Sequence, residues 1–258
     1  MMVRPVGNDG PVCGRFAVTT DPARLATVID ALDETGGALA APNYNVAPTT
    51  DIATVVARHG DPGDPGDRAT RRLRLMRWGL LPPWAVDPGK AGTRPAHPLI
   101  NARAETLTTS PAFRAAAKRR RCLVPMDGYY EWRPNPDTPK RGRKTPFYFY
   151  RPDGAPLLVA GLWAAGTPEV PSTCTIVTTA AVGEFADVHD RMPLVLGEGD
   201  WDRWLDPDAE APADVLAAPP DAGPMAMREV ATLVNNVANN GPELIEAAGP
   251  GNQPVGLF

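Results

Sequence analysis

The stretch RCLVPMDGYYEW at residues 121–132 holds two short apolar runs, 121–125 and 128–132. Further runs of strand length follow at residues 145–151, 157–163 and 174–179, and two others come earlier, at 51–58 and 73–79. Pro and Gly are frequent between these runs, which indicates turns. Short strands at this spacing favour a sheet that curls on itself. We therefore predict an α+β protein: a single domain with a curled antiparallel β-sheet or barrel core, flanked by short helices.

One flanking helix is predicted near the start of the chain. Asp21 is typical of an N-cap, and Pro22 suits the first helical position. Gly36-Gly37 is expected to end the helix. Shorter helices are predicted near residues 111–117 and 200–205, and a last strand at 230–234. The apolar stripe of the first helix has helical spacing and is expected to face the core, through Leu25, Val28, Ile29 and Leu32.

Basic residues are concentrated in the middle of the chain. The net charge is −4, yet residues 68–151 hold 19 Lys and Arg against five Asp and Glu. This asymmetry favours a basic face that binds a phosphate backbone. The alternative is a set of solvated loops, because the basic runs at residues 118–121 and 140–144 flank predicted strands. Charge alone leaves both interpretations open.

The composition also indicates the cellular setting. No apolar run reaches the 18 residues that indicate a membrane helix, so no membrane interaction is expected. The first twelve residues lack the apolar segment of a secretory signal. Three widely spaced cysteines and three histidines argue against a metal site, and we expect neither metal nor cofactor. A reducing cytoplasm fits this cysteine usage, with Cys122 and Cys174 as buried structural residues.

Four stretches place polar residues among apolar or turn-forming neighbours, at 13–16, 101–103, 129–132 and 189–193. Glu131 lies between aromatic residues in a predicted strand. Burial there would raise the pKa of its carboxyl group and suit it to proton transfer near neutral pH. The alternative is a carboxylate on the solvated face. His189, beside Asp190 and Arg191, is either a general acid or base or part of a surface charge cluster.

Cys13 is followed by Gly14 close to the start of the chain. As an internal residue it offers only a thiol. If the chain began at Cys13, the residue would also carry a free α-amine. Such a 1,2-aminothiol closes a stable five-membered ring on an aldehyde, so the chemistry of Cys13 depends on whether its amine is free.

The chain resembles the SOS-response-associated peptidase (SRAP) family of abasic-site processing proteins, from Cys13 to about Ile245. A single shared motif would be weak, but here a whole series occurs in the right order. The motifs are CGRF at 13–16, YNVAP at 44–48, RWG at 77–79, NARAET at 101–106, DGYYEW at 127–132, IVTTAA at 176–181, HDRMPLVL at 189–196 and NNGPELI at 239–245.

The resemblance implies a compact α+β fold and a covalent reaction with single-stranded DNA. An abasic site opens to an aldehyde, which the Cys13 α-amine would attack to give a Schiff base. The Cys13 thiol would then close a thiazolidine, so that a durable crosslink shields the lesion during the DNA damage response. The family also implies peptidase or hydrolase and lyase-like activities, a monomer, and a bacterial cytoplasmic protein associated with the nucleoid.

Site residues follow from the same motifs. The resemblance implies that Asn101 orients the cysteine and its adduct, that Glu131 shuttles protons, and that His189 assists proton transfer to the departing sugar oxygen. Other residues of the motifs would form the DNA-binding groove. In that groove Arg15 and Arg103 would hold phosphates, Trp78 and Pro48 would stack against or wedge between bases, and Thr178 would support Glu131.

Twelve residues precede Cys13, and while they are attached no α-amine exists. We therefore expect residues 1–12 to be a disordered extension and residues 13–250 to form the SRAP domain. One explanation is autoproteolysis between Val12 and Cys13. The other is a misassigned start, because a GTG start codon translated internally would appear as Val12. We favour the second explanation as a hypothesis.

Two other functions also fit parts of the sequence. An N-terminal-nucleophile glutamine amidotransferase would use an exposed Cys13 followed by Gly14, but it would not need Glu131, His189 or the basic region. A non-catalytic single-stranded DNA binder would use the basic face and Trp78 alone. It predicts that no bond to DNA survives denaturation.

Overall fold

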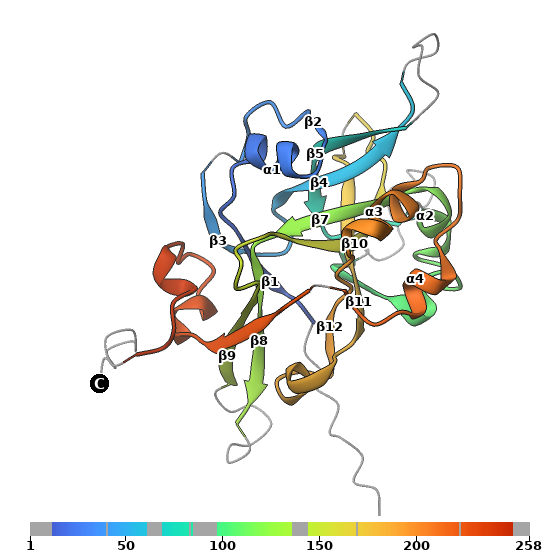
Figure 1. Cartoon of the computed structure of the whole chain (residues 1–258). Coiled ribbons are helices and arrows are strands. Elements are labelled where there is room, and N and C mark those ends of the chain that lie inside the picture. The colour runs from blue at the N-terminus through green and yellow to red at the C-terminus, as the bar shows by residue number, and fades with distance from the viewer. Residues whose placement is uncertain are drawn as a thin grey trace, which may run out of the picture.

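The computed structural model describes residues 12–39, 41–60, 69–82, 84, 97–135, 144–168, 170–221 and 223–249. The predicted extension therefore lies outside the described residues, except for Val12. Strands dominate the fold (Figure 1), and no helix in the described ranges is long and apolar enough to cross a membrane. The strands are β1 (Arg15–Val18), β2 (Leu32–Asp33), β3 (Asn43–Val46), β4 (Asp51–Arg58), β5 (Thr70–Trp78), β6 (Asn101–Arg103), β7 (Arg121–Met126), β8 (Gly128–Pro134), β9 (Lys144–Tyr150), β10 (Leu157–Ala164), β11 (Thr173–Ala180), β12 (Arg191–Pro193) and β13 (Ala226–Glu229). The α-helices are α1 (Pro22–Val28), α2 (Arg114–Arg119), α3 (Glu198–Leu205) and α4 (Ala213–Ala217).

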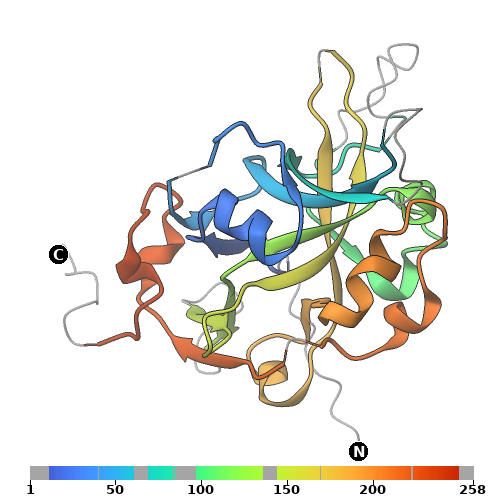
Figure 2. The same ribbon diagram turned by 45° about the horizontal axis from the view of Figure 1, so that its top comes forward.

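The larger sheet closes on itself. Its order is β12-β11-β10-β7-β4-β5-β2, with β6 paired to β11. Strand β11 also pairs in parallel with β5, where Cys174 lies opposite Trp78. Strands β5, β4, β7, β10 and β11 thus form a ring (Figures 1 and 2). The predicted α+β fold with a curled sheet is confirmed, although β11 with β5, β11 with β6 and β2 with β5 are parallel pairs.

The smaller sheet has the order β13-β9-β8-β1-β3. Its strand pairs are antiparallel, with Phe16 of β1 opposite Tyr129 of β8 and Arg15 opposite Tyr130. This register continues the chain upstream of Arg15 along β8. It therefore brings Cys13 next to Glu131, although the two residues are 118 positions apart.

One apolar core joins the two sheets. The rings of Phe16 in the smaller sheet and Trp78 in the larger sheet lie 5.0 Å apart between their centroids. Cys122 and Cys174 are fully buried in the same cluster, as predicted. Cys13 and Tyr129 belong to it as well, so the predicted reactive cysteine lies at the junction of the sheets rather than on a surface loop.

The first helix is shorter than predicted. The Asp21 side chain caps it by accepting hydrogen bonds from two backbone N–H groups, as predicted, but α1 ends at Val28. Leu25 and Ile29 are buried, whereas Val28 and Leu32 are 53% and 56% exposed. The predicted stripe is wrong at Val28, which is exposed at the end of α1. It is also wrong at Leu32, because the chain turns after Ile29 and residues 32–33 pair with β5 as strand β2 instead.

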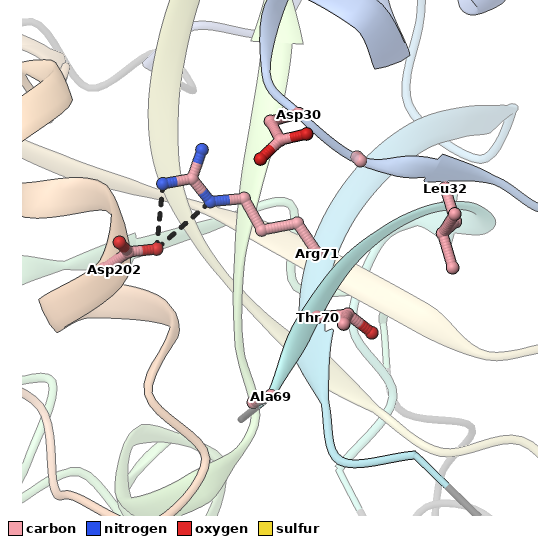
Figure 3. A pocket seen from close by; sticks show the side chains of 7 residues that line it. Asp30, Leu32, Ala69, Thr70, Arg71 and Asp202 are labelled. Atoms are coloured by element: carbon pink, nitrogen blue, oxygen red, sulfur yellow. Dashed lines mark hydrogen bonds and ion pairs between the residues drawn. The ribbon is translucent and has the colours of Figure 1, made fainter. Parts of the chain in front are cut away.

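Helices α2, α3 and α4 gather on one side of the larger sheet (Figure 1). An ion pair fixes α3 to the edge of that sheet. The Arg71 side chain in β5 donates from Nε and NH2 to Asp202 of α3, at 3.1 and 2.8 Å (Figure 3). The same guanidinium donates to the Ile29 carbonyl oxygen at 2.8 Å, so the end of α1 is held at the same point.

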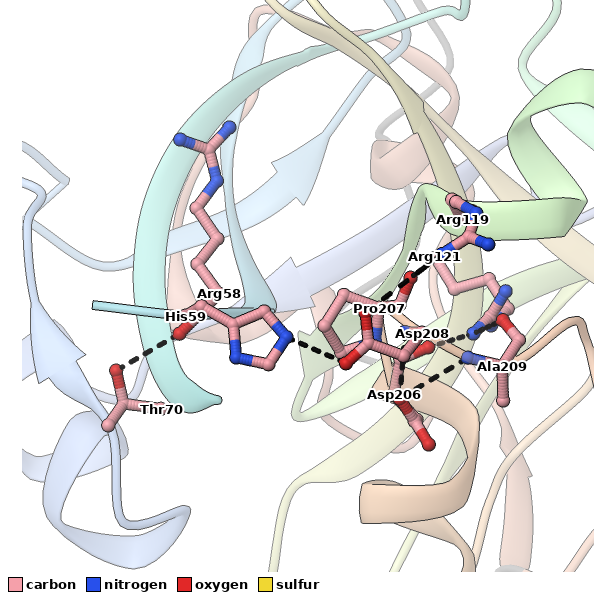
Figure 4. Close-up of polar contacts among 9 residues, drawn as sticks. All are labelled: Arg58, His59, Thr70, Arg119, Arg121, Asp206, Pro207, Asp208 and Ala209. Carbon is pink, nitrogen blue, oxygen red and sulfur yellow. Dashed lines mark hydrogen bonds and ion pairs between the residues drawn. The ribbon is translucent and has the colours of Figure 1, made fainter. Parts of the chain in front are cut away.

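Arg121 fastens the segment that follows α3. Its side chain is buried, and the guanidinium donates to the carbonyl oxygens of Asp206 and Ala209, the latter at 2.9 Å (Figure 4). Burial lowers the pKa of Arg121. Nearby, His59 Nε2 lies 2.7 Å from a carboxylate oxygen of Asp208. The acidic C-terminal third is thus attached to the basic centre of the chain.

Several arginines of the basic region form ion pairs with acidic residues. Arg72 and Arg74 both contact the Glu34 carboxylate, at 2.5 and 3.1 Å, and Arg77 contacts Asp51 at 3.4 Å. Acidic residues from outside the basic region therefore neutralise several of its cations. The charge asymmetry of the sequence does not by itself define a DNA-binding face.

The last predicted strand is also misplaced. Residues 226–229 form β13 against β9, whereas Thr232–Asn235 is a 3-10 helix. Only Val230 of the predicted segment makes a strand-like pair, with Ala247. The segment after β13 lies beside β3 and β9, away from α2 to α4 (Figure 1).

Candidate active site

The amide group between Val12 and Cys13 forms hydrogen bonds to two side chains, one at its N–H and one at its carbonyl oxygen. The Cys13 N–H donates to Glu131 Oε1 at 2.5 Å. The Val12 carbonyl oxygen accepts a hydrogen bond from Asn101 Nδ2. Cys13 itself is fully buried and has a φ of 44°, which is unfavourable for a residue with a side chain. Asn101 and Glu131 therefore converge on the two ends of one amide group.

The Glu131 carboxyl group is deeply buried and has a raised pKa. It lies in β8 and is 3% exposed. Burial raises the pKa of its carboxyl group to about 8, while hydrogen bonds from the backbone of Cys13 and Trp132 act in the opposite direction. A carboxyl group with this pKa can both give and take a proton near neutral pH. The sequence hypothesis that Glu131 is buried and its pKa raised is confirmed.

Asn101 approaches from the larger sheet. It is the first residue of β6, which pairs in parallel with β11 and places Asn101 opposite Ile176. Its Nδ2 is used by Val12, whereas its Oδ1 is buried and has no partner among the described residues. An amide held this way can polarise a carbonyl group and still accept one further hydrogen bond.

His189 lies just before β12 and is 5% exposed. Its Nδ1 is 3.0 Å from the Arg191 N–H and 3.0 Å from an oxygen of Asp190, which is itself largely exposed. Burial lowers the pKa of His189 despite the Asp190 charge. A neutral ring that accepts from Arg191 at Nδ1 carries its proton on Nε2. That Nε2 is buried and unpartnered within the described part of the chain.

The histidine loop borders Glu131. The Asp190 charge raises the pKa of Glu131, whereas the Lys144 charge lowers the pKa of both Glu131 and His189. The Cys13 thiol also responds to Glu131, because burial and then the carboxylate charge raise its pKa. The structure thus brings Asn101 and Glu131 onto the amide of Cys13, and it places the charge of Asp190 in the His189 loop within electrostatic reach of Glu131.

Two of the predicted phosphate ligands differ in availability. Arg15 NH1 donates to Asn45 Oδ1 at 2.7 Å and to the Val234 carbonyl oxygen at 3.0 Å, so this guanidinium is anchored to the protein. Arg103 ends β6 and is exposed, and its guanidinium has no hydrogen bond or ion pair to the described residues. Pro48 is partly exposed in the turn after β3.

The prediction that Trp78 stacks on bases is wrong for this conformation. Its ring is 0% exposed, packs on Phe16, and donates from Nε1 to the Ile100 carbonyl oxygen at 2.9 Å. Thr178 is buried too. It contacts Ala102 and Arg191, not Glu131, among the residues described here. Sequence motifs identified both positions but could not tell which face of the strand each side chain occupies.

Arg191 was expected only as a charged neighbour of His189, yet it has a structural role at the site. Its guanidinium contacts both carboxylate oxygens of Glu105, at 2.5 and 3.0 Å, and the Thr178 carbonyl oxygen at 2.6 Å. Its backbone N–H meets His189 Nδ1. Arg191 therefore holds the histidine loop against β11. Its position two residues after His189 was the signal available in the sequence.

The described surface pockets lie elsewhere. The pocket of Figure 3 is lined by Asp30, Arg71 and Asp202, and another lies beside His59 and Asp208 (Figure 4). Neither contains a residue of the cysteine site. In the described residues, no group of three or more His, Cys, Asp or Glu side chains could hold a metal ion.

Solved structures share this architecture. A protein from Bacteroides thetaiotaomicron matches with a TM-score of 0.71 at 23% sequence identity, covering 92% of this chain and 100% of that chain. A protein from Bordetella bronchiseptica matches with a TM-score of 0.62 at 28% identity, covering 84% and 99% respectively. The ring and the smaller sheet thus define a recurrent single-domain fold class.

Sequence comparison specifies the family. The model of the SOS response associated peptidase (SRAP) family matches residues 12–237. Abasic site processing protein YoqW of Bacillus subtilis is 40% identical over 212 residues, covering 80% of this chain and 86% of the relative. Abasic site processing protein YedK of Escherichia coli is 31% identical over 249 residues, covering 91% and 99%. The chain belongs to the SRAP family.

Proposed function

We propose that this protein captures abasic sites in single-stranded DNA as a thiazolidine formed by Cys13. The observation that carries the proposal is the convergence of Asn101 and Glu131 on the amide of Cys13. The nitrogen that would become the nucleophile already touches a carboxyl group able to exchange protons near neutral pH. The names of the relatives, abasic site processing proteins, support DNA with abasic sites as the partner.

The reaction begins when the free α-amine of Cys13 adds to the aldehyde carbon of the opened sugar. Glu131 accepts the proton that the amine loses and returns one to the hydroxyl group, which leaves as water. The resulting Schiff base is attacked by the Cys13 sulfur, and the electron pair of the carbon–nitrogen bond returns to nitrogen. One water is lost in total. His189, with its proton on Nε2, would donate to the sugar oxygen that departs when the ring opens.

The amine must first be released from Val12. With Val12 attached, Asn101 polarises the Val12 carbonyl group, and the sulfur of Cys13 is the adjacent nucleophile. Attack of the sulfur on that carbon would give a thioester as the peptide nitrogen leaves with a proton from Glu131. Water would then hydrolyse the thioester and free both groups of Cys13. The same residues thus serve the release and the capture, with residues 1–12 as the released extension and residues 13–250 as the working domain.

DNA would be bound chiefly through its backbone. The Arg103 guanidinium is exposed and makes no hydrogen bond to the described residues, and Arg15 retains donors beyond its anchored Nη1. Guanidinium groups suit phosphates because they offer forked donors. We propose binding as a monomer, with Pro48 beside the lesion and Trp78 supporting the site from below rather than stacking on bases.

The test compares three chains on an oligonucleotide with one abasic site, read on a denaturing gel. A chain that begins at Cys13 should give a covalent band. A chain whose extension cannot be removed should give none. A chain that begins at residue 13 and carries Cys13→Ala should also give none. A band that persists in Cys13→Ala would overturn the proposal. Glutamine hydrolysis without any band would favour the amidotransferase, and binding without any band would favour a non-catalytic DNA binder.

A further inference from the structure

Tyr129 occupies a position in the site that the mechanism above does not use. It lies two residues before Glu131 in β8, so the two side chains share one face of the strand. Its ring stacks on Phe149 of β9, with centroids 4.7 Å apart and planes 8° apart. The ring is thus fixed, and the direction of the hydroxyl group is fixed with it.

The Tyr129 hydroxyl is buried without a partner. The residue is 1% exposed, and its oxygen makes no hydrogen bond within the described ranges. Such an orphaned polar atom is costly, and phenylalanine would fill the same space without it. Tyr130 provides the contrast on the opposite face, because its hydroxyl donates to the Tyr44 carbonyl oxygen at 2.8 Å.

The orphaned hydroxyl belongs to the same core as the reacting cysteine. Tyr129 and Cys13 belong to the same buried cluster, and Phe16, three residues after Cys13, lies directly opposite Tyr129. After burial, the Cys13 charge is the largest influence that raises the pKa of Tyr129, followed by the Glu131 charge. Tyr129 therefore stays protonated at neutral pH and can only be a donor toward a negative sulfur.

The thiol needs such a donor. Burial and Glu131 both raise the pKa of the Cys13 thiol, yet the thiolate is the form that attacks carbon. Glu131 does not offset this, because its charge itself raises the pKa of the thiol. We propose that, once Val12 is released, the Tyr129 hydroxyl donates a hydrogen bond to the Cys13 sulfur and stabilises the thiolate for ring closure.

This inference rests on the proposed thiazolidine chemistry and assigns Tyr129 to its second stage. As the thiol gives its proton to Glu131, the Tyr129 O–H bond remains intact and its hydrogen bond shortens on the developing thiolate. The sulfur–carbon bond then forms, and the electron pair of the carbon–nitrogen bond moves to nitrogen. Schiff-base formation uses only the amine, so it should not need Tyr129.

The experiment measures the two stages separately in chains that begin at Cys13. Sodium borohydride added at timed intervals reduces the Schiff base and traps it, whereas samples without borohydride retain only the closed ring on a denaturing gel. In Tyr129→Phe, Schiff-base trapping should stay within about twofold of wild type, and ring closure should slow about tenfold. The pH at half-maximal closure rate should rise by about one unit. Tyr130→Phe is the matched control and should leave both rates and the pH profile unchanged.

The outcomes separate this inference from the proposed function. If the wild-type chain forms no covalent product, the proposed function fails. If wild type reacts and Tyr129→Phe closes the ring at the same rate with the same pH profile, the role of Tyr129 is overturned. Equal slowing of both stages would also overturn it, because a general disturbance of the fold or of Glu131 would act on both. Thermal unfolding should show Tyr129→Phe to be at least as stable as wild type, since an unpartnered hydroxyl is removed.

Discussion

Glu131 Oε1 accepts the backbone N–H of Cys13 at 2.5 Å, across 118 positions of sequence. The contact joins β8 to the residues just before β1. The register of the smaller sheet thus places the carboxyl group on the Cys13 nitrogen. A buried carboxyl group with a pKa of about 8 is thereby placed on the nitrogen that must become an amine. The proposed proton transfers to and from the Cys13 nitrogen depend on this one relationship.

Replacing this carboxyl group should slow crosslinking without abolishing it. Glu131→Gln keeps an oxygen that can accept from the Cys13 nitrogen but cannot exchange a proton. General acid–base catalysis contributes roughly 10²-fold or more, so the rate of covalent product at neutral pH should fall about 100-fold. Timed denaturing gels measure it. A variant as fast as wild type would show that Glu131 takes no part in proton transfer.

The raised pKa of Glu131 also predicts how stability changes with pH. The folded state binds a proton that the unfolded state has already lost between about pH 4.5 and pH 8. The free energy of unfolding of the wild type should therefore fall, relative to Glu131→Gln, as the pH rises through this window. A pKa shift of this size changes the difference in unfolding free energy between the two chains by about 5 kcal/mol across the window.

Urea unfolding at several pH values measures the difference. Glu105→Gln is the control with the opposite pH dependence. Arg191 lowers the pKa of Glu105, so the stability that the Glu105 carboxylate contributes is lost as the pH falls. A constant difference between wild type and Glu131→Gln across the window would show that Glu131 is not protonated when buried.

Asn101 should matter for the release of residues 1–12. Asn101→Ala removes the donor on the Val12 carbonyl oxygen, where negative charge develops as the sulfur attacks. Loss of one such donor typically costs 10²–10³-fold in rate. Mass spectrometry of the extended chain should show correspondingly slower cleavage between Val12 and Cys13. Asn240→Ala, which alters surface contacts near β3, should cleave as wild type does. Equal cleavage in Asn101→Ala would contradict this role.

Arg103 should contribute to DNA affinity through charge alone. Binding of Cys13→Ala to an abasic oligonucleotide can be followed without covalent capture. Adding Arg103→Ala should reduce the slope of log affinity against log salt by about 0.7, the value for one phosphate contact with a single strand. Arg203→Ala is the matched control, because its guanidinium already pairs with Asp200 and Asp214. An unchanged slope in Arg103→Ala would exclude a phosphate contact.

Much of the fold could be predicted because its strands are local patterns. The predicted segment at 51–58 coincides with β4, and those at 121–125 and 157–163 differ from β7 and β10 by one residue at one end. The stripe of α1 failed at Val28 and Leu32, because apolar spacing cannot show that a tertiary pairing with β5 ends a helix early. The closure of the ring by β11 and β5 depends on contacts about 100 positions apart, which no local pattern encodes.

The site was predictable in its residues but not in its geometry. Motifs identified Cys13, Asn101 and Glu131. Only the fold shows that Asn101 and Glu131 both hydrogen-bond the amide group between Val12 and Cys13. Trp78 lies in the core instead of the groove that the resemblance implied, because an aromatic residue in a basic region suits either a base or a core. Tyr129 lies in the DGYYEW motif, and its spacing of two from Glu131 indicates a shared face of the strand.

The most direct test of the central claim is the intact mass of the DNA adduct of a chain that begins at Cys13, measured with and without sodium borohydride. The account predicts the sum of the two masses less one water, unchanged by borohydride, because a thiazolidine has no carbon–nitrogen double bond to reduce. A mass that gains two hydrogens with borohydride, or the absence of any adduct, would contradict it.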